Sequence, residues 1–387
     1  MVSRVTPGHH EPDSRPPAQR GYPRQMVALS ARPRAAAPVT LDALASELTP
    51  LTTVARQGAG ECSVTCVTLS TERVEAGDLY AALPGARVHG ADFAALAVDR
   101  GAVAVLTDSD GASRLPAGTP ALVVGDVRAV LGRVAAFVYG DPATSMTMIG
   151  VTGTQGKTTT TRLLDEALRS AGVASAVIGT NGTAVRGVEV PTSLTTPEAP
   201  DLHGLFAMMR EEKVQACAME VSSHALALGR VDAVRFDVAT FLNLGRDHLD
   251  FHTDVEAYFE AKASLFTPLR AVRGLANVDD AHGRRLLGSA GVPMSSYSVK
   301  DPAADWTARR VQLGPLGSRF VVHGPHGQQW PVEVTVPGEF NVSNALAAVA
   351  SASIAGLPGA EVASGFAHGR GVPGRLERVA SSHPFTV

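Results

Sequence analysis

The sequence has few of the features that would mark a secreted, membrane-spanning or nucleic-acid-binding protein. Its only cysteines are Cys62, Cys66 and Cys217, an odd set without the spacing of a disulfide framework or of a zinc site, so we predict reduced, packed thiols. No apolar run approaches the roughly 20 residues that a membrane-spanning helix needs. The net charge of -3 gives no reason to expect nucleic-acid binding or membrane insertion. These absences predict a soluble, cytoplasmic protein.

The first 39 residues differ from the rest of the chain. Residues 1–39 lack apolar periodicity and are rich in arginine and proline. A targeting peptide would need an apolar core or an amphipathic arginine helix, and the prolines disfavour both. We predict a disordered basic extension, with Met26 as an alternative start of the protein.

Length and composition predict more than one folded unit. A chain of 387 residues exceeds an average domain, and 45% hydrophobic with 18% charged residues is ample for a buried core. Between Thr40, a candidate helix cap, and the breaker Gly140-Asp141-Pro142, short strand-like runs alternate with helical stretches, which predicts a small α/β domain over residues 40–141. The expected strands are 64–69, 79–83, 103–107 and 121–124, and the expected helices include 93–99 and 129–139.

A larger α/β domain is predicted over residues 142–380. Buried strands are expected at 146–152, 174–178, 216–221, 238–242 and 275–278, with a helix at 158–171. Polar residues follow several of these strands, at the edge of a parallel sheet where ligands bind. After Val299 the pattern favours antiparallel strands at 319–323 and 330–336, followed by a helix at 343–354. Residues 381–387 read as the start of a further domain.

A glycine-rich loop lies between the strand at 146–152 and the helix at 158–171. It consists of Gly153, Thr154, Gln155, Gly156, Lys157, Thr158 and Thr159. Small residues let backbone N–H groups turn toward phosphate oxygens, and the helix N-terminus adds positive potential. Lys157 would reach the β- and γ-phosphates of a nucleotide, and the Thr158 hydroxyl would hold Mg²⁺. The general phosphate loop has a glycine where this sequence has Val151, so this loop is shorter.

This short loop form, GTxGKTT after a strand, resembles that of the Mur ligases and the folylpolyglutamate synthetases. Three further blocks are similar to the diamino-acid-adding branch of the Mur ligases: EVSSHAL from Glu220, NLGRDHLDFH from Asn243 and YFEAK from Tyr258. The run from Gly77 to Gly85 resembles the opening of a uridine-binding domain, and TTPE from Thr195 the threonine–proline segment of the family. The resemblance covers about residues 64 to 380.

The resemblance implies an ATP-dependent, ADP-forming amide ligase of peptidoglycan synthesis, and so of cell-wall biogenesis, cell shape and cell division. ATP would phosphorylate a carboxylate of UDP-N-acetylmuramoyl-L-alanyl-D-glutamate, and the amine of a diamino acid would attack the acyl phosphate. Because two anions must meet, Mg²⁺ and cationic groups would carry much of the catalysis. The alanine- and arginine-rich sequence, similar to actinobacterial versions, favours meso-diaminopimelate; L-lysine is the alternative.

Individual site residues follow from the same resemblance. Lys157, Glu220, His248 and Lys262 would be catalytic, and Thr158, Glu220, His248 and Lys262 would form the metal site. On chemistry alone Lys262 reads as a helix-surface lysine and His248 as structural. In similar enzymes the equivalent lysine is carbamylated by CO₂, which puts a negative charge beside the metal. Asn344 would face the nucleotide.

The acceptor would be contacted from both domains. The positions that match the muramoyl-peptide and diphosphate contacts are Thr195, Thr196, Ser222 and Arg230, where the planar fork of arginine suits a phosphate. The positions that match the uridine contacts are Leu69 and Thr71, with Ala86, Arg87 and Val88 in the loop over the base. The usual Asp-Ser-Arg of the first motif reads Ser70-Thr71-Glu72, and a common glutamine is replaced by Leu228.

Two alternative functions stay open. Another Mur-type ligase, such as the D-alanyl-D-alanine-adding enzyme, shares the uridine domain, and a nucleotide-binding regulatory relative would keep the fold without the chemistry. Similar enzymes carry an Asp-Asn-Pro-Arg type motif in a C-terminal domain that supplies the amino-acid pocket, and no such motif precedes Val387. We therefore expect a monomer that folds and binds the UDP-linked acceptor but is inactive as a ligase on its own.

Overall fold

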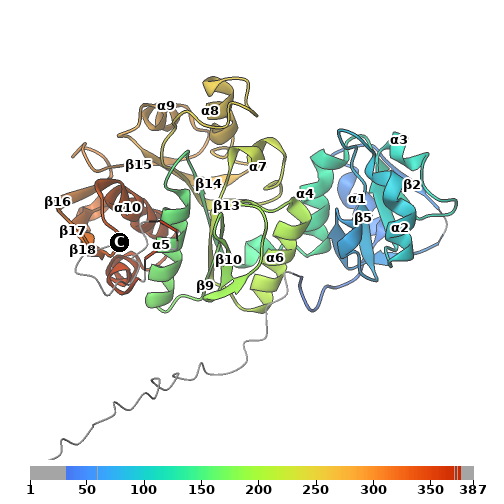
Figure 1. Cartoon of the computed structure of the whole chain (residues 1–387), viewed down its shortest axis with the longest axis horizontal. Coiled ribbons are helices and arrows are strands. Elements are labelled where there is room, and N and C mark those ends of the chain that lie inside the picture. The colour runs from blue at the N-terminus through green and yellow to red at the C-terminus, as the bar shows by residue number, and fades with distance from the viewer. Residues whose placement is uncertain (1–31, 59, 370, 373, 376–387) are drawn as a thin grey trace, which may run out of the picture.

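The computed structural model describes residues 32–58, 60–369, 371–372 and 374–375. Two separate β-sheets, each packed against helices, form most of it (Figure 1). The predicted disorder of residues 1–31, the alternative start at Met26 and the further domain expected from residue 381 lie outside the described residues. Residues 32–39, which the sequence placed in the predicted disordered extension, are described by the structure and contact the first domain. The guanidinium of Arg32 donates to both carboxylate oxygens of Asp78, at 3.1 and 2.9 Å.

The first sheet has five strands in the order β2-β7-β6-β5-β4. Strands β4 (Cys66–Thr68), β5 (Asp78–Ala81), β6 (Ala104–Thr107) and β7 (Ala121–Val124) run parallel, and β2 (Val54–Gln57) is antiparallel at the edge. The surrounding elements are β1 (Val39–Thr40), α1 (Leu41–Leu48), β3 (Ser63–Val64), η1 (Thr71–Arg73), η2 (Gly90–Phe93), α2 (Ala94–Asp99), α3 (Ser109–Ala112) and α4 (Val127–Val138). The hydroxyl of Thr40 accepts from the backbone N–H of Ala43 and caps α1, as the sequence predicted.

The second sheet has eleven strands in the order β11-β10-β9-β12-β8-β13-β14-β15-β16-β17-β18. The parallel strands are β8 (Thr147–Thr152), β9 (Ser175–Gly179), β12 (Ala216–Glu220), β13 (Phe236–Phe241), β14 (Ala271–Asn277), β15 (Met294–Ser298) and β16 (Trp306–Gly314). The antiparallel strands are β10 (Gly182–Val185) and β11 (Val188–Val190) at one edge and β17 (Gly317–His323) and β18 (Gln329–Val334) at the other. The fold class predicted from the sequence is therefore confirmed.

Two apolar cores cover the faces of this sheet. One contains side chains of α5 (Lys157–Ser170), α10 (Glu339–Ile354) and α11 (Gly359–Gly365). The other contains side chains of α6 (Ala199–Glu211), α7 (Ser223–Ala227), α8 (Val255–Ala263) and α9 (Ala281–Ser289). The remaining short helices are η3 (Pro142–Ser145), η4 (Pro325–Gly327) and η5 (Phe366–His368).

The two sheets meet through α4 and α6, which pack together (Figure 1). A Cβ on Gly132 of α4 would lie 2.5 Å from the carbonyl oxygen of Asp232, so only glycine allows this backbone contact. Ion pairs join the same surfaces: Arg128 of α4 lies 3.1 Å from Glu198, and Arg73 lies 2.9 Å from Asp201 of α6. The predicted boundary near residue 141 falls between the two sheets.

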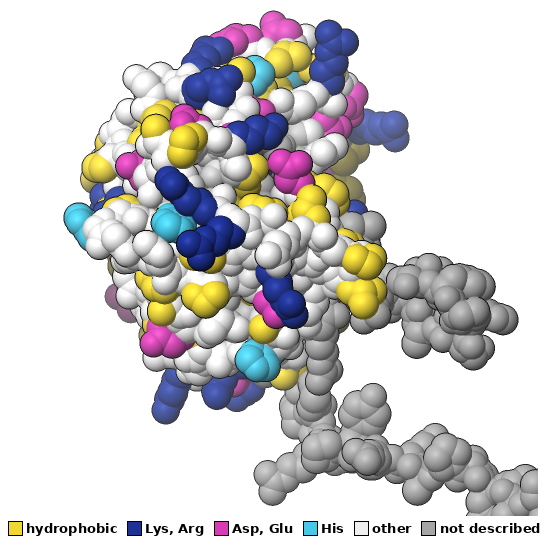
Figure 2. All heavy atoms as spheres, turned by 90° about the vertical axis from the view of Figure 1, so that its left-hand side faces the viewer, with side chains coloured by type: hydrophobic (Ala, Val, Ile, Leu, Met, Phe, Trp, Pro, Cys, Tyr) yellow, Lys and Arg dark blue, Asp and Glu magenta, His cyan; other side chains and the backbone are white. Residues whose placement is uncertain are grey.

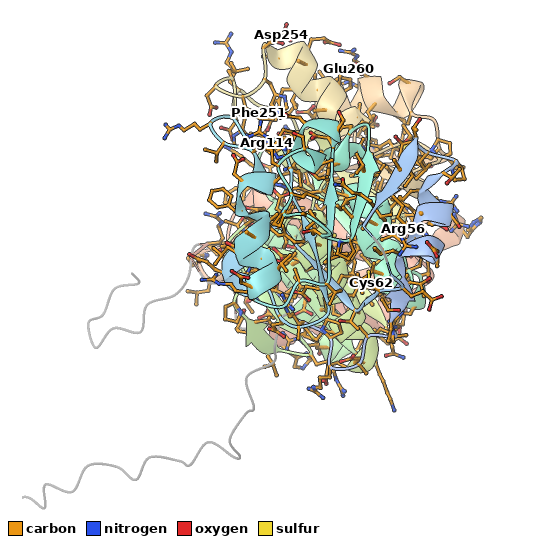
Figure 3. All side chains as sticks on the ribbon, turned by 90° about the vertical axis from the view of Figure 1, so that its right-hand side faces the viewer. Arg56, Cys62, Arg114, Phe251, Asp254 and Glu260 are labelled. Carbon is orange, nitrogen blue, oxygen red and sulfur yellow. The ribbon has the colours of Figure 1, made fainter. Side chains whose placement is uncertain are left out.

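The cysteines are free thiols, as predicted. Cys66 and Cys217 are buried, and Cys62 is half-buried on the first domain (Figure 3). Burial raises the pKa of the Cys62 thiol, an effect that the nearby charge of Arg56 opposes. Within the described part of the chain, no helix is long and apolar enough to span a membrane. On the face beyond β18, basic, acidic and apolar side chains are interspersed (Figure 2).

Candidate functional site

The glycine loop joins β8 to α5, as predicted. Gly153 and Gly156 have φ values of 151° and 91°, conformations that L side chains rarely adopt. Gly156 is the N-cap of α5, so the first N–H groups of the helix face the loop. The Lys157 ammonium folds back over the loop and donates to the carbonyl oxygens of Gly153 at 2.8 Å and Thr154 at 3.1 Å. The loop thus has the backbone form and the cation of a phosphate cradle.

Side chains from the segment after β13 and from helix α8 hold the loop, and sequence reasoning missed them. The side-chain oxygen of Asn243 accepts from the backbone N–H groups of Thr154 at 3.2 Å and Gln155 at 2.9 Å. The hydroxyl of Thr154 lies 3.2 Å from that of Tyr258 and accepts from the N–H of Gly245 at 2.9 Å. Asn243 and Tyr258 are the first residues of two of the blocks that resemble the Mur ligases. That position was the only sequence feature that could have marked them as site residues.

Glu220 ends β12, the immediate neighbour of β8 in the sheet, as expected. Its side chain is only 1% exposed. One carboxylate oxygen accepts from the backbone N–H of Thr180 at 2.8 Å, and the other accepts from the Thr180 hydroxyl at 3.1 Å. A Cβ on Gly179 would lie 2.2 Å from the nearer oxygen, so the carboxylate occupies a space that only glycine leaves open.

Lys262 lies on α8, but it is not the surface lysine that its chemistry alone indicates, because it is 1% exposed. Its ammonium donates to the Gly153 carbonyl oxygen at 3.0 Å and lies 4.4 Å from the centre of the Tyr258 ring. Burial, together with the charge of Lys157, lowers the pKa of Lys262 well below that of a free lysine. Lys157 and Lys262 therefore converge on one carbonyl oxygen of the glycine loop.

His248 is a weaker member of the cluster. Its side chain is 41% exposed, and its ring centre lies 6.0 Å from that of Tyr258 and 4.8 Å from that of His224. Among the described residues, no three His, Cys, Asp or Glu side chains are grouped closely enough to hold a metal ion. A metal here would need ligands of other kinds, such as a modified lysine, hydroxyls or the oxygens of a phosphate.

Charges around Lys157 extend the site beyond the predicted residues. Burial lowers the pKa of Lys157, while the carboxylates of Glu220 and Asp247 oppose that shift and Arg375 adds to it. Asp247 also opposes the lowered pKa of Lys262. Sequence reasoning placed Asp247 in a family-like block without assigning it a role.

The remaining predicted nucleotide contacts also lie beside the loop. Thr158 and Thr159 are buried in the first turn of α5. Asn344 on α10 is 7% exposed, and a Cβ on Gly156 would lie 2.5 Å from its side-chain oxygen. The structure thus brings Asn344 to the glycine loop from far along the chain.

The predicted acceptor contacts of the central domain lie near Glu220. The Thr196 hydroxyl donates to the backbone carbonyl of Glu220 at 2.9 Å and lies 3.4 Å from the hydroxyl of Ser222. The hydroxyls of Thr195 and Thr180 are 3.1 Å apart. Arg230 donates from Nε to the carboxylate of Glu198 at 2.8 Å, so its charge is paired within the chain.

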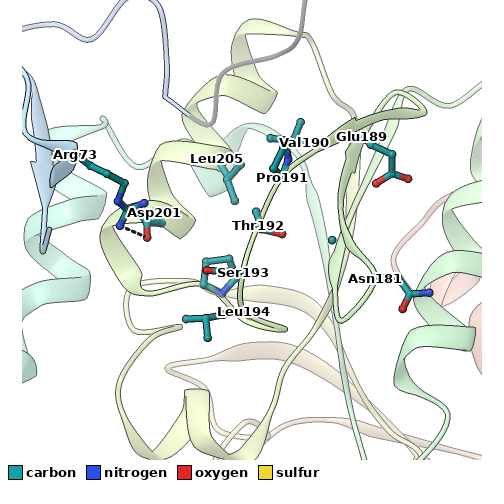
Figure 4. A pocket seen from close by; sticks show the side chains of 12 residues that line it. Arg73, Asn181, Glu189, Val190, Pro191, Thr192, Ser193, Leu194, Asp201 and Leu205 are labelled. Carbon is teal, nitrogen blue, oxygen red and sulfur yellow. Dashed lines mark hydrogen bonds and ion pairs between the residues drawn. The ribbon is translucent and has the colours of Figure 1, made fainter. Parts of the chain in front are cut away.

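A cavity of 590 Å³ lies next to these threonines, between α6 and the β10–β11 hairpin (Figure 4). Polar side chains and a cation from the first domain share its lining with leucines and prolines. They include Arg73, Asn181, Glu189, Thr192, Ser193 and Asp201. The cavity therefore lies where Arg73 of the first domain meets Asp201 of the central domain.

The residues predicted to contact uridine lie in the first domain. They follow strands of the five-stranded sheet, whereas the glycine loop follows a strand of the eleven-stranded sheet. Leu69 and Thr71 follow β4, and Ala86, Arg87 and Val88 follow the neighbouring parallel strand β5. The loop residues are exposed, and the N–H of Gly85 donates to the carbonyl of Val88 at 3.1 Å. Carboxyl ends of adjacent parallel strands are a usual place for ligand contacts.

Comparison with known proteins agrees with this geometry. The family model described as "Mur ligase middle domain" matches residues 151–352, and "Mur ligase family, catalytic domain" matches residues 63–139. A UDP-N-acetylmuramoyl-L-alanyl-D-glutamate--2,6-diaminopimelate ligase of Streptomyces coelicolor is 51% identical over 328 residues, 84% of this chain and 65% of that protein. The protein of the same name from Streptomyces avermitilis is 49% identical over 344 residues, 87% of this chain and 68% of that protein.

A solved structure of a ligase of the same name superposes with a TM-score of 0.70 at 29% identity, covering 83% of this chain and 66% of that one. The chain thus spans about two thirds of the length of these relatives. Family models match the regions of both sheets, and the relatives are similar over most of the chain. The chain therefore belongs to the Mur ligase family.

Proposed function

We propose that this chain contributes the acceptor-binding and nucleotide-binding parts of an ATP-dependent ligase that joins a diamino acid to UDP-N-acetylmuramoyl-L-alanyl-D-glutamate. The observation that carries the proposal is the convergence at the glycine loop. The amines of Lys157 and Lys262 both donate to the Gly153 carbonyl oxygen, at 2.8 and 3.0 Å. The negative charge of Glu220 opposes the lowering of the Lys157 pKa by burial. Cations and a buried carboxylate at a helix N-terminus suit phosphoryl transfer between two anions.

Lys157 would bind the transferred phosphoryl group. Its ammonium donates to two carbonyl oxygens of the loop, which are weaker partners than a phosphate. Turning toward a β- or γ-phosphate would replace these contacts by charge-assisted ones. The carboxylate of the acceptor would then attack the γ-phosphorus, and ADP would leave with the electrons of the broken P–O bond.

Mg²⁺ would be held by Glu220, Thr158, His248 and a carbamate on Lys262. The fit is supported by the buried Glu220 carboxylate, whose two oxygens are oriented by Thr180 and keep further lone pairs. Mg²⁺ usually binds through one or two carboxylates together with phosphate oxygens and water, so a set without three clustered acidic groups is suitable. When bound, the metal would neutralise charge between the two anions.

Carbamylation of Lys262 is supported by its burial and its lowered pKa. A neutral amine can attack the carbon of CO₂, forming an N–C bond while one C=O electron pair moves to oxygen and the nitrogen loses a proton. The lowered pKa of Lys262 leaves more neutral amine at a given pH than a free lysine has. The product is an anion in place of a potential cation beside Lys157.

The acceptor would lie across the two domains, with its uridine at Leu69, Thr71 and the loop Ala86–Val88. Its muramoyl-peptide end would approach Thr195, Thr196, Ser222 and Arg230. The incoming amino acid is proposed as 2,6-diaminopimelate rather than L-lysine, because the relatives described above are named for it.

Calorimetry on the chain of 387 residues tests this proposal. We expect binding of ADP that depends on Mg²⁺, and separate binding of the UDP-linked acceptor. Nucleotide binding without any binding of the acceptor would favour a regulatory relative instead. Preference for the tripeptide-bearing acceptor over the dipeptide-bearing one would favour the D-alanyl-D-alanine-adding branch.

A further inference from the structure

We infer that Thr180 is a positioning residue that fixes the Glu220 carboxylate and links it to the acceptor side of the site through Thr195. The inference rests on the proposed function, because it takes Glu220 as a metal ligand and Thr195 as an acceptor contact. Thr180 belongs to none of the sequence motifs. It lies in the two-residue turn between β9 and β10, whose ends pair at Gly179 and Gly182.

Both oxygens of the Glu220 carboxylate are held by this one residue. The backbone N–H of Thr180 donates to the first oxygen at 2.8 Å, and the hydroxyl donates to the second at 3.1 Å. Two donors from one residue fix the plane of the carboxylate as well as its position. Since each carboxylate oxygen has more than one acceptor site, both keep a lone pair for a cation.

The turn that carries Thr180 is itself anchored to the phosphate-loop helix. The guanidinium of Arg162 on α5 donates to the carbonyl oxygens of Asn181 and Gly182 and to the carboxylate of Glu189. Arg162 is 8% exposed, so its guanidinium is largely shielded from water, although its partner Glu189 is exposed. Thr180 is exposed, but the backbone that follows it is held by the guanidinium of Arg162, so the turn can support Glu220 in a fixed position.

The direction of the hydrogen bonds follows from the single proton of each hydroxyl. Thr180 donates its proton to Glu220, so toward Thr195, 3.1 Å away, it must act as the acceptor. Thr195 is then the donor, and the chain runs from Thr195 through Thr180 to the carboxylate. Thr195 therefore presents lone pairs, not its proton, to a ligand until that chain is broken.

Replacing Thr180 tests the inference, since valine removes the hydroxyl at nearly constant shape and serine restores it. We expect T180V to weaken the Mg²⁺ dependence of ADP binding by about fivefold, the scale of one hydrogen bond, and T180S to recover it. Isothermal titration of ADP at a series of Mg²⁺ concentrations gives this dependence, and Mn²⁺ binding followed by electron paramagnetic resonance reports it without any turnover.

Two further variants make the test specific. T183V removes a hydroxyl of β10 whose described hydrogen-bond partner is Thr192, at 3.2 Å, and not Glu220, so it should leave Mg²⁺ dependence unchanged. T195V should also leave it unchanged while weakening acceptor binding, because Thr180 still donates to Glu220. Equal loss in T195V and T180V would mean that the hydrogen bond from Thr180 to Glu220 is not what carries the effect, and it would overturn the inference.

The outcomes separate this inference from the proposed function. Mg²⁺-dependent ADP binding in the unsubstituted chain, with T180V indistinguishable from it, would overturn the role of Thr180 alone. An unsubstituted chain without Mg²⁺-dependent ADP binding would overturn both. Thermal unfolding of each variant shows whether a loss of binding reflects a loss of folding.

Discussion

The two predicted ligand regions differ in how the chain holds them. At the glycine loop, the amines of Lys157 and Lys262 donate to backbone carbonyl oxygens, and Lys262 is 1% exposed. The Glu220 carboxylate, on the neighbouring strand, is held by Thr180 and is also 1% exposed. In the first domain, Ala86, Arg87 and Val88 stand in an exposed loop, with Val88 54% exposed. The first region is held by contacts within the protein, whereas the second offers exposed surface that a ligand would have to order. Substitutions should therefore matter much more at the glycine loop.

The strongest test of this contrast is Lys157→Ala. We expect ADP affinity to fall by about 100-fold or more, because the nucleotide phosphates lose their main side-chain cation while the loop remains folded. Calorimetry measures the change, and Lys300→Ala, an exposed lysine elsewhere, is the matched control. Near-normal affinity in the Lys157 variant would refute the assignment of the loop.

The second test concerns Lys262. After equilibration with ¹³CO₂, we expect a carbamate signal in ¹³C NMR that is absent from Lys262→Ala. The signal should weaken as pH falls through the pKa of Lys262, because protonation removes the nucleophilic lone pair; since that pKa is lowered, the loss should come at lower pH than for a free lysine.

In a protein with ligase activity, Lys262→Ala should lower the rate by about 100-fold or more, the scale of losing a group that stabilises transition-state charge. Short carboxylic acids should restore part of it by occupying the vacated space. An active alanine variant, or a spectrum without a carbamate, would contradict the role proposed for Lys262.

Arg230 lies between the two regions in its expected effect. Arg230→Ala should weaken acceptor binding by about tenfold, and ADP affinity should change by no more than about threefold, because the arginine is held by Glu198 on the acceptor side. Arg235→Ala, an exposed arginine on the following segment, is the control. Equal losses of both affinities would indicate misfolding instead of a lost contact.

The smallest effect is expected in the first domain. Arg87→Ala should weaken acceptor binding by about threefold, because an exposed side chain gains little from a contact that water competes for. Competition between the acceptor and free UDP, measured by calorimetry, shows whether the lost contact is at the nucleotide end. A loss as large as that of Arg230→Ala would mean that this loop closes firmly over its ligand, and the contrast between the regions would disappear.

How much the sequence could predict follows the same contrast. Buried strands such as β8 and β12 are short apolar runs bounded by breakers, and their positions were predicted within about two residues. The hairpin of β10 and β11 was missed, because its strands have only four and three residues and are too short to show a period. Thr180 lies in the turn that leads into β10, so its contact with Glu220 was missed as well.

Site residues within a continuous motif could be predicted, and contacts between distant segments could not. Lys157 and Thr158 follow a strand directly, so their place was fixed by local sequence. The packing of Asn243 on Thr154, and of Lys262 on Gly153, depends on sheet order and on side-chain burial. Propensity and spacing carry no information on either. The burial of Lys262 is the clearest case, since its helix alone reads as a surface helix.

The contact of Gly132 with the Asp232 carbonyl has a thermodynamic consequence. Because the backbones of the two domains touch there, folding itself buries surface between the domains. Acceptor binding should then bury the surface of the ligand and of the cavity between α6 and the β10–β11 hairpin, without burying further surface between the domains. The heat-capacity change of acceptor binding should be correspondingly small. In that case the relative placement of the two domains is a property of folding and not of binding.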